Sequence, residues 1–426
     1  MKHSSFTGSM MDFKLFIYFN SRGVNMNRRF FLSLGGATTA GFLAHSENAY
    51  SNLESKAIDL SNGMDSIKIR DVQVAAIQDE YICNLVKITT DAGVYGLGEA
   101  RVKNLKYLKL IKDLKSLVIG ENPLRVEYLT RKMIAASKAD IETAMGAISG
   151  IETALWDLSG RILNTPSYNL LGGKYHDKVK VYYDLSPADS PNTVDPKPWA
   201  ERAVSAVKAG FKAIKFDIYR GGGDVPDWAQ ILKVVRETVG PDIQIGVDFH
   251  WRLTPEQTNR FVTLVEPANL WFIEDPMNYE KYEKDYQQLV AEAKIPVVAL
   301  EGMRTIKSFH HWINKGICSI IEADGQYCGG LLELKRAANL GELYGMDTIC
   351  HNMCTPVGTY AQAHACATIP SFLIMENACA ENVILNETSL YQDGYLVLND
   401  KPGFGIELNE DYCRKNLAEG SKFFGV

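Results

Sequence analysis

The sequence has no excess of basic residues. Its 45 lysines and arginines are outnumbered by 51 aspartates and glutamates, which gives a formal net charge of −6, and the two kinds are interspersed along the chain. Because no basic stripe is available to neutralise a phosphate backbone, we expect no nucleic-acid partner. The negative charge also opposes capture of an anionic substrate, so an acidic substrate would need a local cation such as a bound metal ion.

Cysteines in metal-binding spacing are also lacking. The eight cysteines are scattered along the chain, although Cys350 and Cys354 flank His351. We expect most of them to be buried as small hydrophobic residues, and we predict that no disulfide is essential.

No apolar run near the N-terminus is long enough to span a bilayer comfortably. The run that ends at about residue 44 follows Arg28 and Arg29, within a Met-Asn-Arg-Arg-Phe-Phe-Leu segment that begins at Met26. This pattern predicts an export signal of the twin-arginine type. We therefore expect residues 1–60 to be a leader, with the true start near Met26. The mature chain is predicted to be periplasmic and to have no membrane span.

The remaining chain is long enough for two domains, since 426 residues with 46% hydrophobic content can form more than one core. Strand-like segments at residues 67–74, 81–89 and 94–98 are followed by helical periodicity at 105–117, 125–138 and 141–163. Strands followed by helices predict an α+β domain over residues 62–178.

Residues 179–398 follow a different pattern, in which short β-branched strands alternate with helices. No glycine-rich dinucleotide loop follows the first strand, which disfavours a doubly wound sheet. The expected strands lie at residues 179–185, 213–218, 243–250, 270–275, 296–301, 319–324, 347–351 and 372–376. Eight strands in this alternation predict an α/β fold of the TIM-barrel type.

Side chains that can bind metal or transfer protons stand where the predicted strands end, which is where active sites form in such barrels. From the third strand to the eighth, these residues are Asp248 and His250, Glu274, Glu301, Glu322 and Asp324, His351, and Glu376. Carboxylates ending three consecutive strands would repel one another without a cation. Hard oxygen ligands with open positions suit Mg²⁺. The sequence therefore predicts one Mg²⁺ per subunit, bound by Asp248, Glu274 and Glu301.

Several short motifs occur in the order and spacing of one known family. They are Thr-Asp-Ala-Gly at 90–93, Gly-Leu-Gly-Glu at 96–99, Ala-Leu-Trp-Asp at 154–157 and Leu-Leu-Gly-Gly at 170–173. Together with the strand-end residues, they resemble the mandelate racemase subgroup of the enolase superfamily from residue 66 to the end. In this resemblance Asp248, Glu274 and Glu301 match the family's metal ligands, and Asp324 and His351 match its Asp-His dyad. Glu376 matches the family's acid on the eighth strand.

The resemblance implies a modified TIM barrel, (β/α)7β, with an α+β capping domain to which residues 399–426 return, in a homo-oligomer. It also implies removal of the proton alpha to a carboxylate, through an enediolate that Mg²⁺ stabilises and with a Lys or His base. Asp324 would hold the imidazole of His351 in one tautomer and support its imidazolium.

A second histidine is expected on the same face as a metal ligand, because residues i and i+2 of a strand point the same way. His250 stands two residues after Asp248. By resemblance to the family's dehydratases, His250 would protonate the departing β-hydroxyl; the alternative is that it only hydrogen-bonds the substrate. The racemase pattern Lys-x-Lys reads Lys215-Phe216-Asp217 here. Lysine-based racemisation is therefore not expected, although Lys215 could neutralise the substrate carboxylate.

The predicted reaction is dehydration of an aldonate to a 2-keto-3-deoxy acid. The substrate is a small-molecule sugar acid whose identity the sequence leaves open, and its expected contacts are Glu376, Lys215, Asp217 and Arg252. Cycloisomerisation of an anhydro sugar acid and epimerisation by His250 and His351 as paired bases remain alternatives on the same site. A non-catalytic exported sugar-acid binding protein is the alternative from another class.

The export signal can be tested with residues 26–60 fused to a reporter protein. We expect the reporter to leave the cytoplasm only when Arg28 and Arg29 are both present, because the arginine pair is the feature that the export machinery recognises. Cell fractionation of the fusion and of its double-lysine variant measures this, and unchanged export of the variant would remove the twin-arginine interpretation.

Overall fold

The computed structural model describes residues 66–78, 82–101, 105–185, 191–377, 383–387 and 391–425. The predicted export signal lies outside the described residues. Within those residues, none of the helices combines the length and the apolar character needed to cross a membrane.

The capping domain begins with an antiparallel sheet of three strands, β1 (Ile69–Gln78), β2 (Ile82–Thr90) and β3 (Tyr95–Ala100). The helices α1 (Lys106–Val118), α2 (Val126–Ala136), α3 (Ile141–Ile162) and α4 (Ser167–Leu170) follow. Gly96 and Gly98 let β3 lie directly against α3, since a Cβ at either position would overlap a backbone carbonyl of that helix. The G-x-G motif is thus explained by close packing of a strand on a helix.

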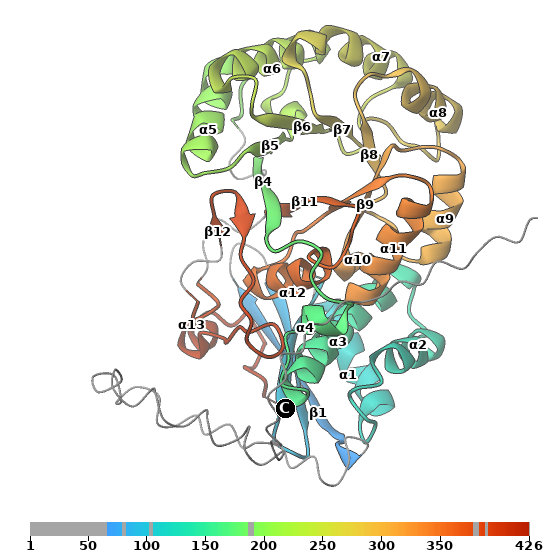
Figure 1. The fold of residues 1–426 in the computed structure, drawn as a ribbon, viewed down its shortest axis with the longest axis vertical. Helices are drawn as coiled ribbons and strands as arrows, with labels where there is room; N and C mark the ends of the chain where they lie inside the picture. Colours follow the sequence, from blue (N-terminus) through green and yellow to red (C-terminus); the bar gives the residue numbers. More distant parts are fainter. Residues whose placement is uncertain are drawn as a thin grey trace, which may run out of the picture. The chain divides into compact units, whose positions relative to one another are not determined.

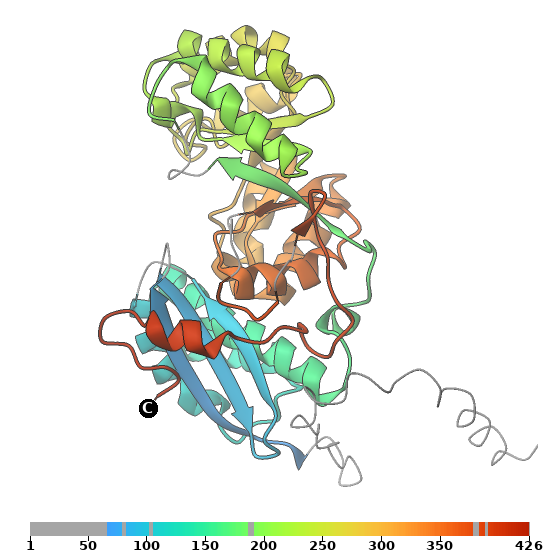
Figure 2. The same cartoon turned by 90° about the vertical axis from the view of Figure 1, so that its left-hand side faces the viewer.

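The other face of this sheet contacts the C-terminal part of the chain, which includes α13 (Glu410–Lys415) (Figure 2). The backbone N–H of Ala418 donates to the carbonyl of Ala76, and the N–H of Gln78 donates to the carbonyl of Asn416. The C-terminal segment therefore runs along β1 through backbone hydrogen bonds, which require no particular side chains.

The second domain is a closed barrel of parallel strands (Figure 1). Its strands are β4 (Val179–Leu185), β5 (Ala213–Phe216), β6 (Gln244–Asp248), β7 (Phe272–Glu274), β8 (Val297–Ala299), β9 (Ile320–Ala323), β10 (Asp347–Cys350) and β11 (Phe372–Asn377). Each strand pairs in parallel with the next, and β11 pairs with β4 to close the sheet. The predicted fold class, an eight-strand barrel with an α+β cap, is confirmed.

Helices connect the barrel strands and cover them from outside, as α5 to α8 do in Figure 1. They are α5 (Pro196–Lys208), α6 (Val225–Val239), α7 (Pro255–Leu264), α8 (Glu283–Glu292), α9 (Ile306–Asn314), α10 (Gly325–Cys328), α11 (Leu331–Leu343) and α12 (Pro356–Cys366), with short 3₁₀ turns at η3 (Ile218–Gly221) and η4 (Glu266–Ala268). A hairpin of β12 (Tyr391–Gln392) and β13 (Tyr395–Leu396) adds an antiparallel pair beside β4, which the sequence analysis did not predict.

The barrel interior is built in two layers. The lower layer is a separate apolar cluster of Tyr182, Ala213, Phe272, Val298, Ile320, Ile349 and Ile374, with one residue from nearly every strand. Because side chains alternate along a strand, the residue two positions later on each strand faces the same interior space. Those positions hold Asp184, Lys215, Glu274, Leu300, Glu322, His351 and Glu376, which are all polar except Leu300. A polar layer therefore lies directly on an apolar floor that excludes water from below.

Buried carboxylates of the capping domain join it to the barrel. Glu99 of β3 accepts hydrogen bonds from the backbone N–H groups of Thr355 and Gly358 at 3.0 and 2.8 Å, at the start of α12. Glu152 of α3 accepts from the N–H groups of Leu331 and Leu332 at 2.8 and 3.1 Å, at the start of α11. Each carboxylate thus accepts hydrogen bonds from backbone N–H groups in the first turn of a barrel helix, which have no partner within the helix. A negative charge at this end also interacts favourably with the helix dipole.

The described cysteines are buried, as expected for small hydrophobic residues. Cys379 lies outside the described residues.

A buried histidine gives the fold a pH dependence that can be measured. His364 of α12 accepts from the N–H of Tyr168 at Nδ1 and donates to the carbonyl of Phe404 at Nε2, both at 3.2 Å. Burial lowers the pKa of His364 to about 3, from 6.5. Since the unfolded chain binds a proton here below about pH 6.5 and the folded chain does not, stability from this group is lost as the pH falls.

We predict that His364→Gln will show a smaller loss of unfolding free energy between about pH 7.5 and pH 5 than the parent, by about 2 kcal/mol. Urea unfolding of both proteins at several pH values measures this difference. Comparing the two proteins cancels the contribution of the carboxylates, which titrate in both. Parallel pH dependences would contradict the prediction.

Candidate active site

The sequence-predicted site residues lie at the C-terminal ends of the barrel strands. Asp248 ends β6 and Glu274 ends β7, and the two are direct partners in the strand register. Glu301 follows β8, Asp324 follows β9, His351 follows β10, and Glu376 lies within β11. Except for Glu301, which is half-buried, these six side chains are buried. The barrel therefore brings together residues that are up to 128 positions apart in the sequence, from 248 to 376.

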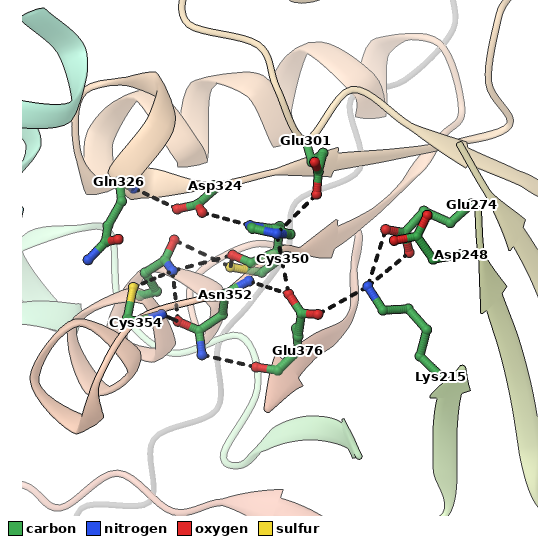
Figure 3. Close-up of polar contacts among 12 residues, drawn as sticks. Lys215, Asp248, Glu274, Glu301, Asp324, Gln326, Cys350, Asn352, Cys354 and Glu376 are labelled. Carbon is green, nitrogen blue, oxygen red and sulfur yellow. Dashed lines mark hydrogen bonds and ion pairs between the residues drawn. The ribbon is translucent and has the colours of Figure 1, made fainter. Parts of the chain in front are cut away.

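Lys215 crosses the centre of the polar layer, between Glu274 and Glu376 (Figure 3). Its Nζ lies 3.2 Å from Glu274 Oε1 and 3.0 Å from Glu376 Oε1. Burial alone would lower the pKa of Lys215, but the two carboxylates raise it well above its ordinary value. Lys215 therefore remains a cation, as expected of a group that neutralises a substrate carboxylate rather than of a base.

His351 is held by carboxylates on both ring nitrogens. Its Nδ1 lies 2.7 Å from Asp324 Oδ2, and its Nε2 lies 3.0 Å from Glu301 Oε2. Burial would lower the pKa of His351, but Glu301, Glu376 and Asp324 raise it well above 6.5. Burial would likewise raise the pKa of Glu301, but His351 lowers it to about 2. The predicted Asp324–His351 pair is thus present, with Nε2 directed at a proposed metal ligand.

Asp324 is itself fixed in place, because its other oxygen caps α10. Oδ1 accepts from the N–H of Gln326 at 2.7 Å, while Oδ2 faces His351. A carboxylate anchored at both oxygens orients the imidazole and selects the tautomer with the proton on Nδ1.

His250 lies beside Asp248 in a turn that follows β6, where its φ is 47°. Its position therefore comes from this turn and not from the strand alternation that we predicted. Its Nδ1 lies 2.8 Å from Asp248 Oδ2, and its backbone N–H donates to Asp248 Oδ1 at 2.8 Å. The Tyr219 hydroxyl lies 3.2 Å from the same Nδ1. Burial would lower the pKa of His250, but Asp248 raises it to about 9. His250 is therefore protonated at neutral pH and able to act as an acid.

The remaining predicted substrate contacts differ in position. Asp217 is buried 3.8 Å from His250 Nδ1 and forms an ion pair with Arg220 at 2.5 Å. Arg252 is exposed, and its guanidinium lies 4.3 Å from the centre of the Tyr219 ring. Arg252 thus stands at the rim of the site and not in the polar layer.

Two further groups of the polar layer had no predicted role. Asp184 and Glu322 are buried, and Asp184 Oδ1 and both carboxylate oxygens of Glu322 lack a hydrogen-bond partner. The sequence could have indicated them, because each stands two residues after an inward-facing floor residue of the same strand, as in Tyr182-x-Asp184 and Ile320-x-Glu322. Tyr219, which contacts His250, follows β5 in a short 3₁₀ turn and carries no comparable pattern.

The described residues contain two groups that could hold a cation. Ligand atoms of Glu274, Glu301 and Glu322 lie within 4.8 Å of one another, as do those of Asp217, Asp248 and His250. The three predicted ligands are thus divided between two groups, although Asp248 lies beside Glu274 in Figure 3. Burial and repulsion from Asp248 and Glu322 raise the pKa of Glu274 well above its usual value, which Lys215 only partly offsets. The nearby positive charge does not balance these carboxylates, and their oxygen atoms are the ligands that a hard divalent cation prefers.

Comparison with known proteins agrees with this geometry. Residues 66–172 match the N-terminal domain of the mandelate racemase/muconate lactonizing enzyme family, and residues 199–412 match the enolase C-terminal domain-like family. A D-xylonate dehydratase from Haloferax volcanii is 32% identical over 407 residues, which cover 89% of this chain and 97% of the relative. A D-galactonate dehydratase from Xanthomonas campestris is 28% identical over 356 residues, 78% of this chain and 90% of the relative.

Solved structures agree with the sequence matches. A mandelate racemase/muconate lactonizing enzyme-like protein from Rubrobacter xylanophilus superposes with a TM-score of 0.78 at 29% identity, over 84% of this chain and all of that protein. The cap and the closed barrel are thus shared features, and the resemblance seen in the sequence motifs is confirmed. The chain belongs to the mandelate racemase/muconate lactonizing enzyme family of the enolase superfamily.

Proposed function

We propose that the chain dehydrates an aldonate to a 2-keto-3-deoxy acid. The observation that carries this proposal is a pair of histidines that face the same site and are held by different carboxylates. His351 is oriented by Asp324 at 2.7 Å, and His250 is kept protonated by Asp248 at 2.8 Å. A base and an acid held apart in this way are what loss of water requires. The named relatives are dehydratases of D-xylonate and D-galactonate, which supports the same reaction class.

Asp248, Glu274 and Glu301 would hold the Mg²⁺, with Lys215 and Glu376 beside the substrate carboxylate. A bound Mg²⁺ would supply positive charge that stabilises the negative charge developing on that carboxylate and offsets the charge of Glu301. His351 would then be free to accept the C2 proton at Nε2, because Nδ1 is held by Asp324.

The electron pair left at C2 forms a double bond to C3 as the C3–oxygen bond breaks. Hydroxide is a poor leaving group, so His250 donates a proton and the oxygen departs as water. The resulting enol tautomerises to the 2-keto-3-deoxy acid.

Epimerisation by two histidine bases is less well supported. It would need one neutral and one protonated imidazole to exchange roles, whereas the contact with Asp248 raises the pKa of His250 to about 9. A purely binding role would not need the Asp324–His351 pair, since an oriented base serves proton transfer.

The metal requirement gives the first prediction for this function. EDTA should abolish activity on aldonates and added Mg²⁺ should restore it, since the crowded carboxylates cannot otherwise stabilise the developing charge. Glu274→Gln should bind Mg²⁺ more weakly, by about tenfold or more, as measured by calorimetry. Glu256→Gln, on the outer helix α7, is the matched control and should bind like the parent. Full activity in metal-free buffer would overturn the assignment.

Substitutions of the two histidines should block different steps of the reaction. His351→Asn should lose both turnover and exchange of the C2 proton with deuterated solvent, because the base is missing. His250→Asn should lose turnover by about 10²-fold or more for a missing general acid, while it retains C2 exchange. Product assay and NMR of the substrate in ²H₂O measure the two quantities.

The exposed His310 of α9 supplies the control, and His310→Asn should behave like the parent in both assays. Exchange by His351→Asn without exchange by His250→Asn would reverse the two roles.

A further inference from the structure

Glu322 occupies the polar layer without any interaction that explains its burial. It lies on β9 between Ile320, in the apolar floor, and Asp324, which orients His351, and alternation places all three on the inner side of the barrel. The side chain is fully buried, and neither carboxylate oxygen has a hydrogen-bond partner. A buried carboxylate without donors is costly unless it is protonated or faces a cation.

The surroundings of Glu322 point to a cation. Its ligand atom lies within 4.8 Å of those of Glu274 and Glu301, two of the proposed Mg²⁺ ligands. Burial and repulsion from Glu301 and Glu376 raise the pKa of Glu322 to about 7, because Lys215 and His351 offset only part of this effect. Lys215 is already shared between Glu274 and Glu376.

Asp248 provides an informative contrast. Both of its oxygens are engaged by His250, one by the ring at 2.8 Å and one by the backbone N–H at 2.8 Å. Glu322 has both oxygens free of such partners and belongs to the group with Glu274 and Glu301, whereas Asp248 belongs to the group with Asp217 and His250. Glu322 is therefore better placed than Asp248 to bind a cation that Glu274 and Glu301 hold.

We propose that Glu322 is a further ligand of the divalent cation, bound together with Glu274 and Glu301. This inference rests on the proposed function in one respect, because both require a divalent cation bound by Glu274 and Glu301. An added anionic oxygen ligand from the polar layer tightens binding of a hard cation and leaves fewer coordination positions open to water or substrate.

The first test measures cation affinity on the full chain, freed of metal with EDTA. Mn²⁺ binding is followed by the electron paramagnetic resonance signal of free Mn²⁺, for the parent, Glu322→Gln and Asp184→Asn. Asp184 is the matched control, because it is also buried in the polar layer with an unpartnered oxygen but belongs to neither ligand group. Each variant replaces a buried carboxyl group by an amide of nearly the same shape.

We expect Glu322→Gln to weaken Mn²⁺ binding by about tenfold or more, and Asp184→Asn to weaken it by clearly less. Equal losses in both variants would show that Glu322 acts only through its charge and would overturn the proposal. Circular dichroism checks that each variant is folded.

The second test does not depend on a variant. A crystal of the parent grown with Mn²⁺ would locate the ion by its anomalous scattering. The proposal expects a Glu322 oxygen at coordination distance, about 2.1 Å as for Mg²⁺–oxygen bonds. An ion beyond hydrogen-bond range of both Glu322 oxygens would overturn it, whatever the affinities show.

The two proposals can fail separately. Mn²⁺ bound through Glu322 in a protein that neither dehydrates any aldonate nor exchanges its C2 proton would refute the proposed function and leave the ligand assignment standing. Dehydration of an aldonate by a protein whose ion does not contact Glu322 would refute the ligand assignment and leave the proposed function standing.

Discussion

The crowding of buried carboxylates at the mouth of the barrel is the constraint on which the rest of the site depends. Asp248, Glu274, Glu322 and Glu376 come from four strands into one water-poor space, and each would be costly as an isolated charge. Lys215 and His351 neutralise part of this charge through contacts at 2.7 to 3.2 Å. The shortfall is what makes the layer a place for a divalent cation and, with it, for an anionic substrate.

The scaffold keeps this costly arrangement in place. An apolar layer that includes Tyr182, Phe272 and Ile349 closes the barrel beneath it, so water cannot enter from below. From the other side, Glu99 of the cap binds the backbone at the start of α12, a few residues after His351. Cap and barrel are therefore joined close to the dyad, and the position of His351 depends on both domains.

The same carboxylates divide the chemistry between the two histidines. His351 contacts Asp324 through Nδ1 and Glu301, one of the proposed metal ligands, through Nε2, so its basicity is tied to the charge on Glu301. His250 lies against Asp248 on the other side of the layer, at the half-exposed edge near Tyr219. Two imidazoles of the same intrinsic pKa thus face different carboxylates, and the proposed elimination would give them different roles.

The sequence alone was enough to predict the barrel, the cap and most of the polar layer, because βα alternation and strand-end residues are local patterns that a closed barrel turns into one site. The pairing of Asp324 with His351 followed from such patterns and from family motifs, whereas a turn after β6, and not the predicted strand alternation, places His250 beside Asp248. Which carboxylates share a cation could not be read from spacing, since this depends on how far each side chain reaches from its strand. Only the tertiary structure placed Glu322 with Glu274 and Glu301, engaged both oxygens of Asp248 with His250, and left Arg252 at the rim. These outcomes are set by distances of a few ångströms between strands far apart in sequence, and the order of residues along one chain does not encode them locally.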